Sequence, residues 1–190
     1  PDEAIHVELL WATPADPDET DTGPEAGADL DLHFAHPFAS PEVCMDNPAP
    51  AANQPCASSF QSNGWFDSPY DCFWFNAQPN WYEFDPNIDD DPGLDLDDTD
   101  GAGPENVNLN IPEDGAVYRV GVHYWNDHNF GPSLATVRIY IYSTLVFQLS
   151  DVELNHHDMW EVASIAWPSA QVTLKTDAVE NYDIQPNYSH

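Results

Sequence analysis

Val117-Tyr118-Arg119-Val120-Gly121-Val122-His123-Tyr124-Trp125 is the stretch that decides the fold. From Tyr118 to Tyr124 every second residue is tyrosine or valine, which matches the period of two of a β-strand. Residues 134–142 alternate in the same way, and a short polar turn after them predicts that residues 145–149 return alongside as a hairpin. Alternating strands that follow each other so closely indicate an antiparallel sheet.

The same alternation predicts further strands on both sides of this centre. They cover residues 5–11, 29–34, 70–76, 107–109, 160–167 and 172–174. The chain also holds 18 prolines and no run that suits a long helix. We therefore predict an all-β fold, an antiparallel β-sandwich of the jelly-roll or immunoglobulin-like type with long acidic loops.

The length of 190 residues fits a single domain with a short extension at each end. We expect the sandwich to occupy residues 13–176. An N-terminal strand over residues 1–12, suited to donation to a neighbouring chain, precedes it, and a polar C-terminal arm over residues 177–190 follows it.

The formal net charge of -31, with only three lysines and arginines, excludes binding to nucleic acid or to anionic membranes, because both require basic patches. No apolar run is long enough for membrane insertion. Few lysines, many aromatic residues and Asp-rich turns predict an extracellular protein, either secreted or on the cell surface. There one disulfide is expected, and Cys44–Cys56 is our preferred pair, although Cys72 leaves other pairings open.

Two acidic loops share the order Asp-x-Asp-x-Thr-Asp followed by Gly-Pro-Glu, one over residues 16–25 and the other over residues 95–105. Carboxylates this close repel one another unless a cation lies between them, and oxygen ligands on a flexible loop suit calcium. The spacing is not that of an EF-hand. The predicted calcium ligands are Asp16, Asp18, Asp21 and Glu25 in the first loop, Asp95, Asp97, Asp100 and Glu105 in the second, and Asp29 and Asp31 on the strand between them.

Two features of these predictions leave alternatives open. Asp29 and Asp31 share one face of their strand, so that face is either a source of ligands or a solvated outer surface. The aromatic residues of the middle of the chain form a sugar-binding platform, cover one end of the sandwich or fill a contact between subunits. The candidates for the platform are Trp65, Trp74, Trp81 and Tyr82. The chain lacks Gly-x-Ser-x-Gly and His-Glu-x-x-His, so we do not expect an enzyme.

Three motifs together resemble an uncharacterised Asp-rich β-sandwich module of secreted bacterial proteins, similar to YfaP-like domains and more distantly to pre-peptidase C-terminal domains. The motifs are residues 29–33, residues 97–106 and residues 118–124. The resemblance extends from about Ile5 to Trp167 and implies an extracellular, jelly-roll-like sandwich with calcium in its loops and no enzymatic centre. The chain is also similar to subunits of extracellular bacterial fibrils that exchange a terminal strand.

We therefore expect an extracellular structural protein, a calcium-stabilised sandwich that forms a homopolymer by β-strand addition. The strand expected to be donated carries Ile5, Val7, Leu9 and Trp11 on one face. The alternatives are a carbohydrate-binding or adhesive module with a polysaccharide partner, and an accessory domain of a secreted enzyme.

Overall fold

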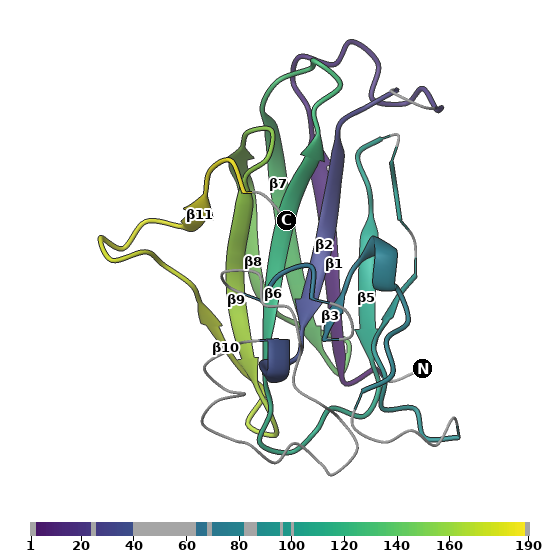
Figure 1. Cartoon of the computed structure of the whole chain (residues 1–190), viewed down its shortest axis with the longest axis vertical. Coiled ribbons are helices and arrows are strands. Elements are labelled where there is room, and N and C mark those ends of the chain that lie inside the picture. The colour runs from purple at the N-terminus through teal and green to yellow at the C-terminus, as the bar shows by residue number, and fades with distance from the viewer. Residues whose placement is uncertain are drawn as a thin grey trace.

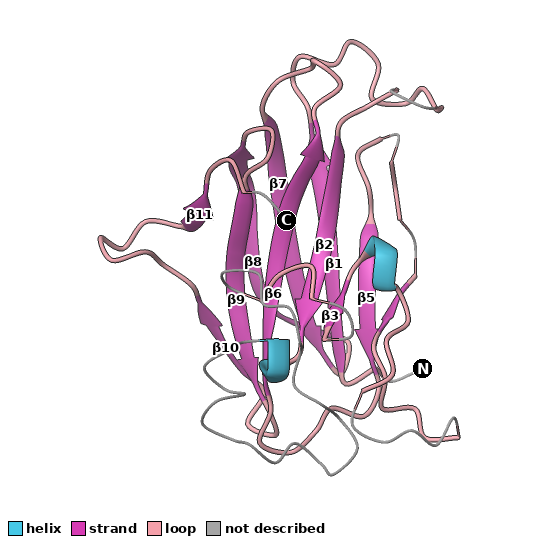
Figure 2. Ribbon diagram, viewed as in Figure 1, coloured by secondary structure: helices cyan, strands magenta, loops and turns pink. Residues whose placement is uncertain are grey.

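Two antiparallel sheets face each other in the computed structural model of the chain (Figure 1). The structure describes residues 3–23, 26–39, 64–67, 70–81, 87–95, 97–99 and 101–188. Strands make up nearly all of the regular structure, with two short 3-10 turns, η1 (Pro37–Ala39) and η2 (Trp74–Asn76) (Figure 2). The predicted β-sandwich is confirmed.

One sheet, called sheet A, has the strand order β4-β5-β1-β7-β8. Its strands are β1 (Ile5–Ala12), β4 (Gly93–Leu94), β5 (Glu105–Leu109), β7 (Ser133–Ile141) and β8 (Thr144–Leu154). The other sheet, sheet B, has the order β10-β9-β6-β2-β3, and β11 also pairs with β9. Its strands are β2 (Asp29–Ala35), β3 (Asp71–Cys72), β6 (Val117–Asn126), β9 (Met159–Ala166), β10 (Gln171–Leu174) and β11 (Asp183–Gln185).

Strand β1 lies in the middle of sheet A, antiparallel to β5 on one side and to β7 on the other. Val7, for example, lies opposite Val107 and opposite Ile139. The alternating side chains Ile5, Val7, Leu9 and Trp11 are buried against sheet B. The predicted N-terminal strand therefore completes the sheet of its own chain and contributes to the centre of the core.

The hairpin between β7 and β8 turns at Tyr142 and Ser143, which have φ values of 46° and 62°. Two consecutive residues with positive φ form the mirror-image turn whose twist matches that of the flanking strands. The sequence predicted this hairpin with its turn one residue later and with a shorter second strand.

Strand β2 is buried on both faces, which alternation alone did not indicate. Leu30, Leu32 and Phe34 face the other sheet, as expected. The opposite face, with Asp31 and His33, is also buried, and side chains of residues 64–67 and 70–76 pack over His33. The ring of His33 stacks on Phe73 at 5.1 Å between centroids and packs against Trp65 and Phe66. The outer face of β2 is therefore not the solvated surface that was one of the two expectations.

Two further segments differ from the sequence predictions. The strand expected over residues 70–76 is only the two-residue β3, followed by the turn η2. The C-terminal arm is attached to sheet B, because β11 pairs with β9 and the Tyr188 ring is buried against Phe66. Within the described residues, no helix has the length and apolar character that crossing a membrane requires.

Candidate metal centre

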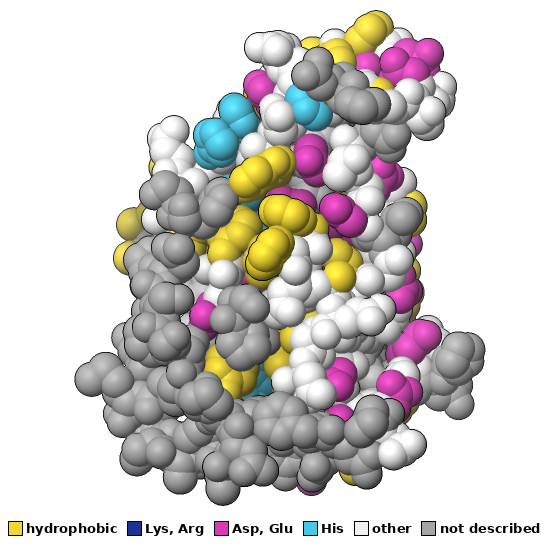
Figure 3. All heavy atoms as spheres, turned by 45° about the vertical axis from the view of Figure 1, so that its right-hand side comes forward, with side chains coloured by type: hydrophobic (Ala, Val, Ile, Leu, Met, Phe, Trp, Pro, Cys, Tyr) yellow, Lys and Arg dark blue, Asp and Glu magenta, His cyan; other side chains and the backbone are white. Residues whose placement is uncertain are grey.

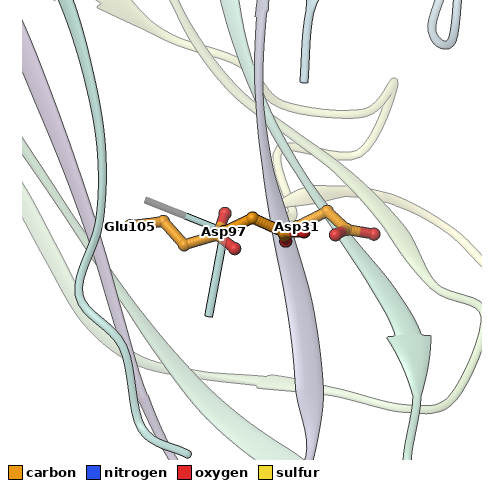
Figure 4. Close-up of side chains that lie close together, drawn as sticks. All are labelled: Asp31, Asp97 and Glu105. Carbon is orange, nitrogen blue, oxygen red and sulfur yellow. The ribbon is translucent and has the colours of Figure 1, made fainter. Parts of the chain in front are cut away.

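Three carboxylates from separate segments meet where the edges of the two sheets approach each other. Asp31 lies on β2 of sheet B, Glu105 begins β5 of sheet A, and Asp97 lies in the loop before β5. One oxygen of each lies within 4.8 Å of the others, and Figure 4 shows the three side chains side by side. Calcium binds oxygen at about 2.3–2.6 Å, so two ligands of one ion lie up to roughly 5 Å apart. The spacing of the triad therefore fits a single ion.

Glu105 holds this arrangement together through its two oxygens. On β5 it shares the inward-facing side with Val107 and Leu109. Its Oε2 accepts the backbone N–H of Leu32 at 2.7 Å, and its Oε1 accepts the N–H of Asp98 at 3.1 Å. Strand β3 pairs only with the last residues of β2, so among the described residues Glu105 takes the place of a neighbouring strand as acceptor for the N–H of Leu32. The carboxylate thus connects sheet A, sheet B and the acidic loop.

Burial and mutual repulsion disfavour the charged forms of these acids. Asp31 is 2% exposed and Glu105 is 1% exposed. Burial, and then the charges of Asp29 and Asp97, raises the pKa of Asp31 well above its usual range. Burial and the charge of Asp31 raise the pKa of Glu105 in the same direction, against the two backbone N–H groups that favour its charged form. Burial, followed by the charge of Asp97, raises the pKa of Asp29 to about 7.

The chain offers these acids no lysine or arginine as a counter-ion. All three of its basic side chains pair with other carboxylates: Arg119 and Lys175 with Glu161, and Arg138 with Glu8. Among the described side chains, His123 lies near these acids, and its Nδ1 is 3.8 Å from Asp31 Oδ2. Protons or a metal cation must therefore supply most of the neutralising charge.

At this site, two buried carboxylate oxygens have no hydrogen-bond donor among the described residues. Asp29 Oδ1 and Asp31 Oδ2 are buried and accept no hydrogen bond from the residues that the structure describes. A buried oxygen without a donor is costly, by about 1–3 kcal/mol and more when it is charged. Metal ligation removes that cost, so both atoms support a cation site.

The two copies of the acidic motif fold differently. The first loop is mostly exposed, and its acids accept bonds from their own backbone: Asp16 from the N–H of Asp18, and Asp18 from Thr20. Among the described residues, Asp16, Asp18 and Asp21 do not converge on a common point. Glu25, like Asp100 of the second loop, lies outside the described residues. The sequence predicted calcium ligands in both loops, whereas only the second has a described cluster.

Of two more predicted ligands, Asp29 lies beside the triad and Asp95 lies apart from it. Asp29 lines a cavity together with Asp31 and Asp97. Asp95 points elsewhere, because its Oδ2 accepts a hydrogen bond from Asn108 at 2.5 Å and it lines a separate, open hollow with Asp89 and Asp91.

The described residues of the predicted aromatic platform differ in burial. Trp65 and Trp81 are 0% and 1% exposed, so neither ring offers a face to a ligand. Trp74 is 40% exposed and lines the same cavity as Asp29 and Asp31. Trp125, which sequence reasoning missed, lines that cavity too. Trp125 lies at the end of β6, next to the acidic start of β2, and this position could have indicated that it belongs to the site.

The remaining predictions fall on other parts of the chain. Tyr82, Cys44 and Cys56 lie outside the described residues. Cys72 is buried on β3 as a free thiol that donates to the carbonyl of Ala77 at 3.5 Å.

Comparison of the chain with protein-family models, with curated proteins and with solved structures finds no match. The function is therefore inferred from the geometry and chemistry of the site.

Gly103 sets how closely the acidic loop approaches β1. Its φ is +82°, and a Cβ there would lie 2.9 Å from the Leu9 carbonyl oxygen and 3.0 Å from the Trp11 ring. We predict that Gly103→Ala displaces the loop, lowers the unfolding temperature and weakens calcium binding although no ligand is removed. Gly115→Ala is the matched control, because φ is +88° there and the space is open. Equal effects of the two substitutions on calcium affinity, measured by calorimetry, would contradict the role of the close approach.

Proposed function

We propose that this chain is an extracellular structural protein whose β-sandwich is stiffened by a calcium ion at Asp31, Asp97 and Glu105. The observation that carries the proposal is the convergence of two buried carboxylates and a third from the loop, within 4.8 Å, at a place where the chain supplies no lysine or arginine. Because the ligands come from both sheets and from the loop, the ion would tie three parts of the fold together.

The donor set favours calcium over other common metals. All three groups are carboxylates, whereas zinc and copper prefer sites that include histidine or cysteine. Magnesium requires a near-ideal octahedron at about 2.0–2.1 Å, whereas calcium accepts six to eight oxygens in irregular arrangements. A triad spread over two sheets and a loop suits the more tolerant ion. His123 Nδ1 lies 3.8 Å from Asp31 Oδ2, which is beyond hydrogen-bond distance.

Calcium removal tests the proposal directly. Metal-free protein should unfold at a lower temperature than calcium-loaded protein, with a stabilisation of about 2.7 kcal/mol when free calcium is a hundredfold above the dissociation constant. The measurement is thermal unfolding of the full chain in chelator and in calcium. Asp18→Asn in the exposed first loop is the control and should respond to calcium as the unchanged protein does. Identical unfolding temperatures with and without calcium would refute the proposal.

The raised pKa values predict how this stabilisation depends on pH. A carboxyl whose folded-state pKa lies above its unfolded-state value favours the folded state at low pH, and that advantage is lost as the pH rises through the window between them. For Asp29 the window runs from its ordinary 3.8 to about 7. Metal-free protein should lose stability across this window as the pH rises.

Calcium replaces the protons, so its stabilising effect should grow over the same window. The measurement is the unfolding temperature at about pH 5 and about pH 8, each in calcium-stripped buffer and in calcium. It compares the loss of stability of the metal-free protein with the growth of the calcium effect. Calcium binding near neutral pH should also release protons, which calorimetry in buffers of different ionisation enthalpy detects. A calcium effect that is constant with pH would mean that these acids are not the ligands.

We also propose that subunits associate by exchange of β1. This strand lies between β5 and β7, which pair with it on both sides. An identical strand from a neighbouring chain fits the same slot with the same hydrogen bonds and the same buried side chains, so exchange costs little in contacts. A head-to-tail exchange that does not close would give a fibre.

A further inference from the structure

A cavity of about 210 Å³ opens next to the metal centre, and tryptophan side chains form part of its wall. Its lining consists of Asp29, Asp31, Asp97, Thr99, Trp74 and Trp125. The rings of Trp74 and Trp125 lie 6.1 Å apart between centroids, and the Trp74 ring is 40% exposed. On the face seen in Figure 3, exposed hydrophobic side chains gather in the middle with acidic side chains next to them.

The carboxylate side of this cavity is built to contact a ligand. Asp31 is almost fully buried, yet its Oδ2 accepts no hydrogen bond from the described residues, and the same holds for Asp29 Oδ1. Both residues line the cavity. Since Asp31 and Asp97 also belong to the triad, an ion held there would lie at the wall of the cavity.

The triad leaves room in the coordination sphere of that ion. Three carboxylates supply three to six oxygens, whereas calcium takes about six to eight. The remaining positions would face the cavity and accept neutral oxygens from water or from a ligand.

We propose that the cavity binds a hexopyranose, whose neighbouring hydroxyl groups coordinate the calcium ion while its ring packs on Trp74 and Trp125. This inference rests on the calcium site of the proposed function. A sugar ring has the two properties that the cavity requires: neutral oxygens in adjacent pairs on its edge, and an apolar face of C–H groups. Thr99 adds a hydroxyl that donates to or accepts from the sugar. The volume is below the roughly 300–1,000 Å³ of pockets for larger ligands, which suits one sugar ring.

The effect of calcium on binding distinguishes a sugar from an organic cation as the ligand. Tryptophan rings beside carboxylates also attract ammonium groups. However, an ammonium group would have to take the place of the calcium ion, whereas a sugar binds together with it. The dependence of binding on calcium therefore separates the two ligand classes.

The test is a titration of the full chain with methyl α-D-mannoside, methyl β-D-galactoside and methyl β-D-glucoside, followed by tryptophan fluorescence and by ligand-observed NMR. Each titration is done in calcium and in chelator, and the unfolding temperature in the same samples reports calcium binding independently. The variants are Trp74→Ala and, as the control, Tyr142→Ala, which removes an exposed aromatic ring outside the cavity. Tetramethylammonium is titrated in parallel.

We expect at least one glycoside to bind in calcium and not in chelator. Trp74→Ala should weaken that binding by about tenfold, the equivalent of one good aromatic contact, and leave the calcium-dependent rise in unfolding temperature unchanged. Tyr142→Ala should bind as the unchanged protein does.

Three results would overturn the inference. One is a calcium-loaded protein, shown by its raised unfolding temperature, that binds none of the glycosides. The second is glycoside binding that persists in chelator or survives Trp74→Ala, and the third is tetramethylammonium binding that calcium competes away without any glycoside binding. A protein that calcium does not stabilise refutes the metal site first, so the failure of each proposal is recognised separately.

Discussion

Glu105→Gln is expected to weaken calcium binding by at least about 100-fold, which corresponds to a loss of roughly 2.7 kcal/mol. The substitution keeps the size of the side chain but removes one of two buried carboxylates in the triad. It also replaces one acceptor oxygen by an NH₂ group, which must face the N–H of either Leu32 or Asp98. One buried backbone donor then loses its acceptor, at a cost of about 1–3 kcal/mol.

The effect on the metal-free protein should be smaller, because two changes oppose each other. Removal of the Glu105 charge relieves its repulsion with Asp31 and Asp97, while the lost hydrogen bond destabilises the edge of β2. The difference between calcium-loaded and metal-free unfolding temperatures should therefore nearly disappear in the variant. Glu153→Gln, on the exposed side of β8, is the control and should retain the full difference. If Glu105→Gln bound calcium as tightly as the unchanged protein, Glu105 would not be a ligand.

The strands were predictable because their alternation directly reflects a two-sided sheet. Tyr118, Val120, Val122 and Tyr124 all face the core, as expected. Strand β2 shows where this reasoning stops. Its alternation correctly separated Leu32 from Asp31, but period alone does not tell what covers the second face. The cover comes from residues 64–67 and 70–76, far along the chain, and the rings of Phe66 and Phe73 pack against His33.

The candidate metal centre was predictable only in part, for a related reason. Both copies of the acidic motif share the order Asp-x-Asp-x-Thr-Asp followed by Gly-Pro-Glu, so this shared pattern does not separate them. In the second copy, Glu105 enters β5 on the inward face and accepts the backbone N–H of Leu32 on β2. That pairing depends on how the two sheets are aligned, which only the folded chain reveals. The sequence likewise does not tell that Trp74 is exposed and Trp81 is buried, because that difference too depends on the folded chain.

Leu9→Ala is expected to have the other large effect, lowering the free energy of unfolding by about 2–5 kcal/mol. Leu9 is fully buried on the central strand of sheet A, between Glu105 on β5 and Val137 on β7. Its truncation leaves a cavity that the flanking strands, each paired on its other side as well, cannot readily close. Leu10→Ala, on the opposite and only partly buried face of the same strand, is the matched control and should cost much less.

The concentration dependence of the same unfolding transition tests the exchange of β1. If neighbouring chains exchange the strand, unfolding also separates subunits, so the unfolding temperature must rise with protein concentration. In that case Leu9→Ala weakens the contact between subunits by the same amount as it weakens the sandwich, and sedimentation of the variant should show shorter polymers. Should the protein stay monomeric at every concentration in calcium, with an unfolding temperature that does not change, then β1 serves only its own sheet. The proposed calcium site would be unaffected by that outcome, because its three carboxylates lie on β2, β5 and the loop between β4 and β5.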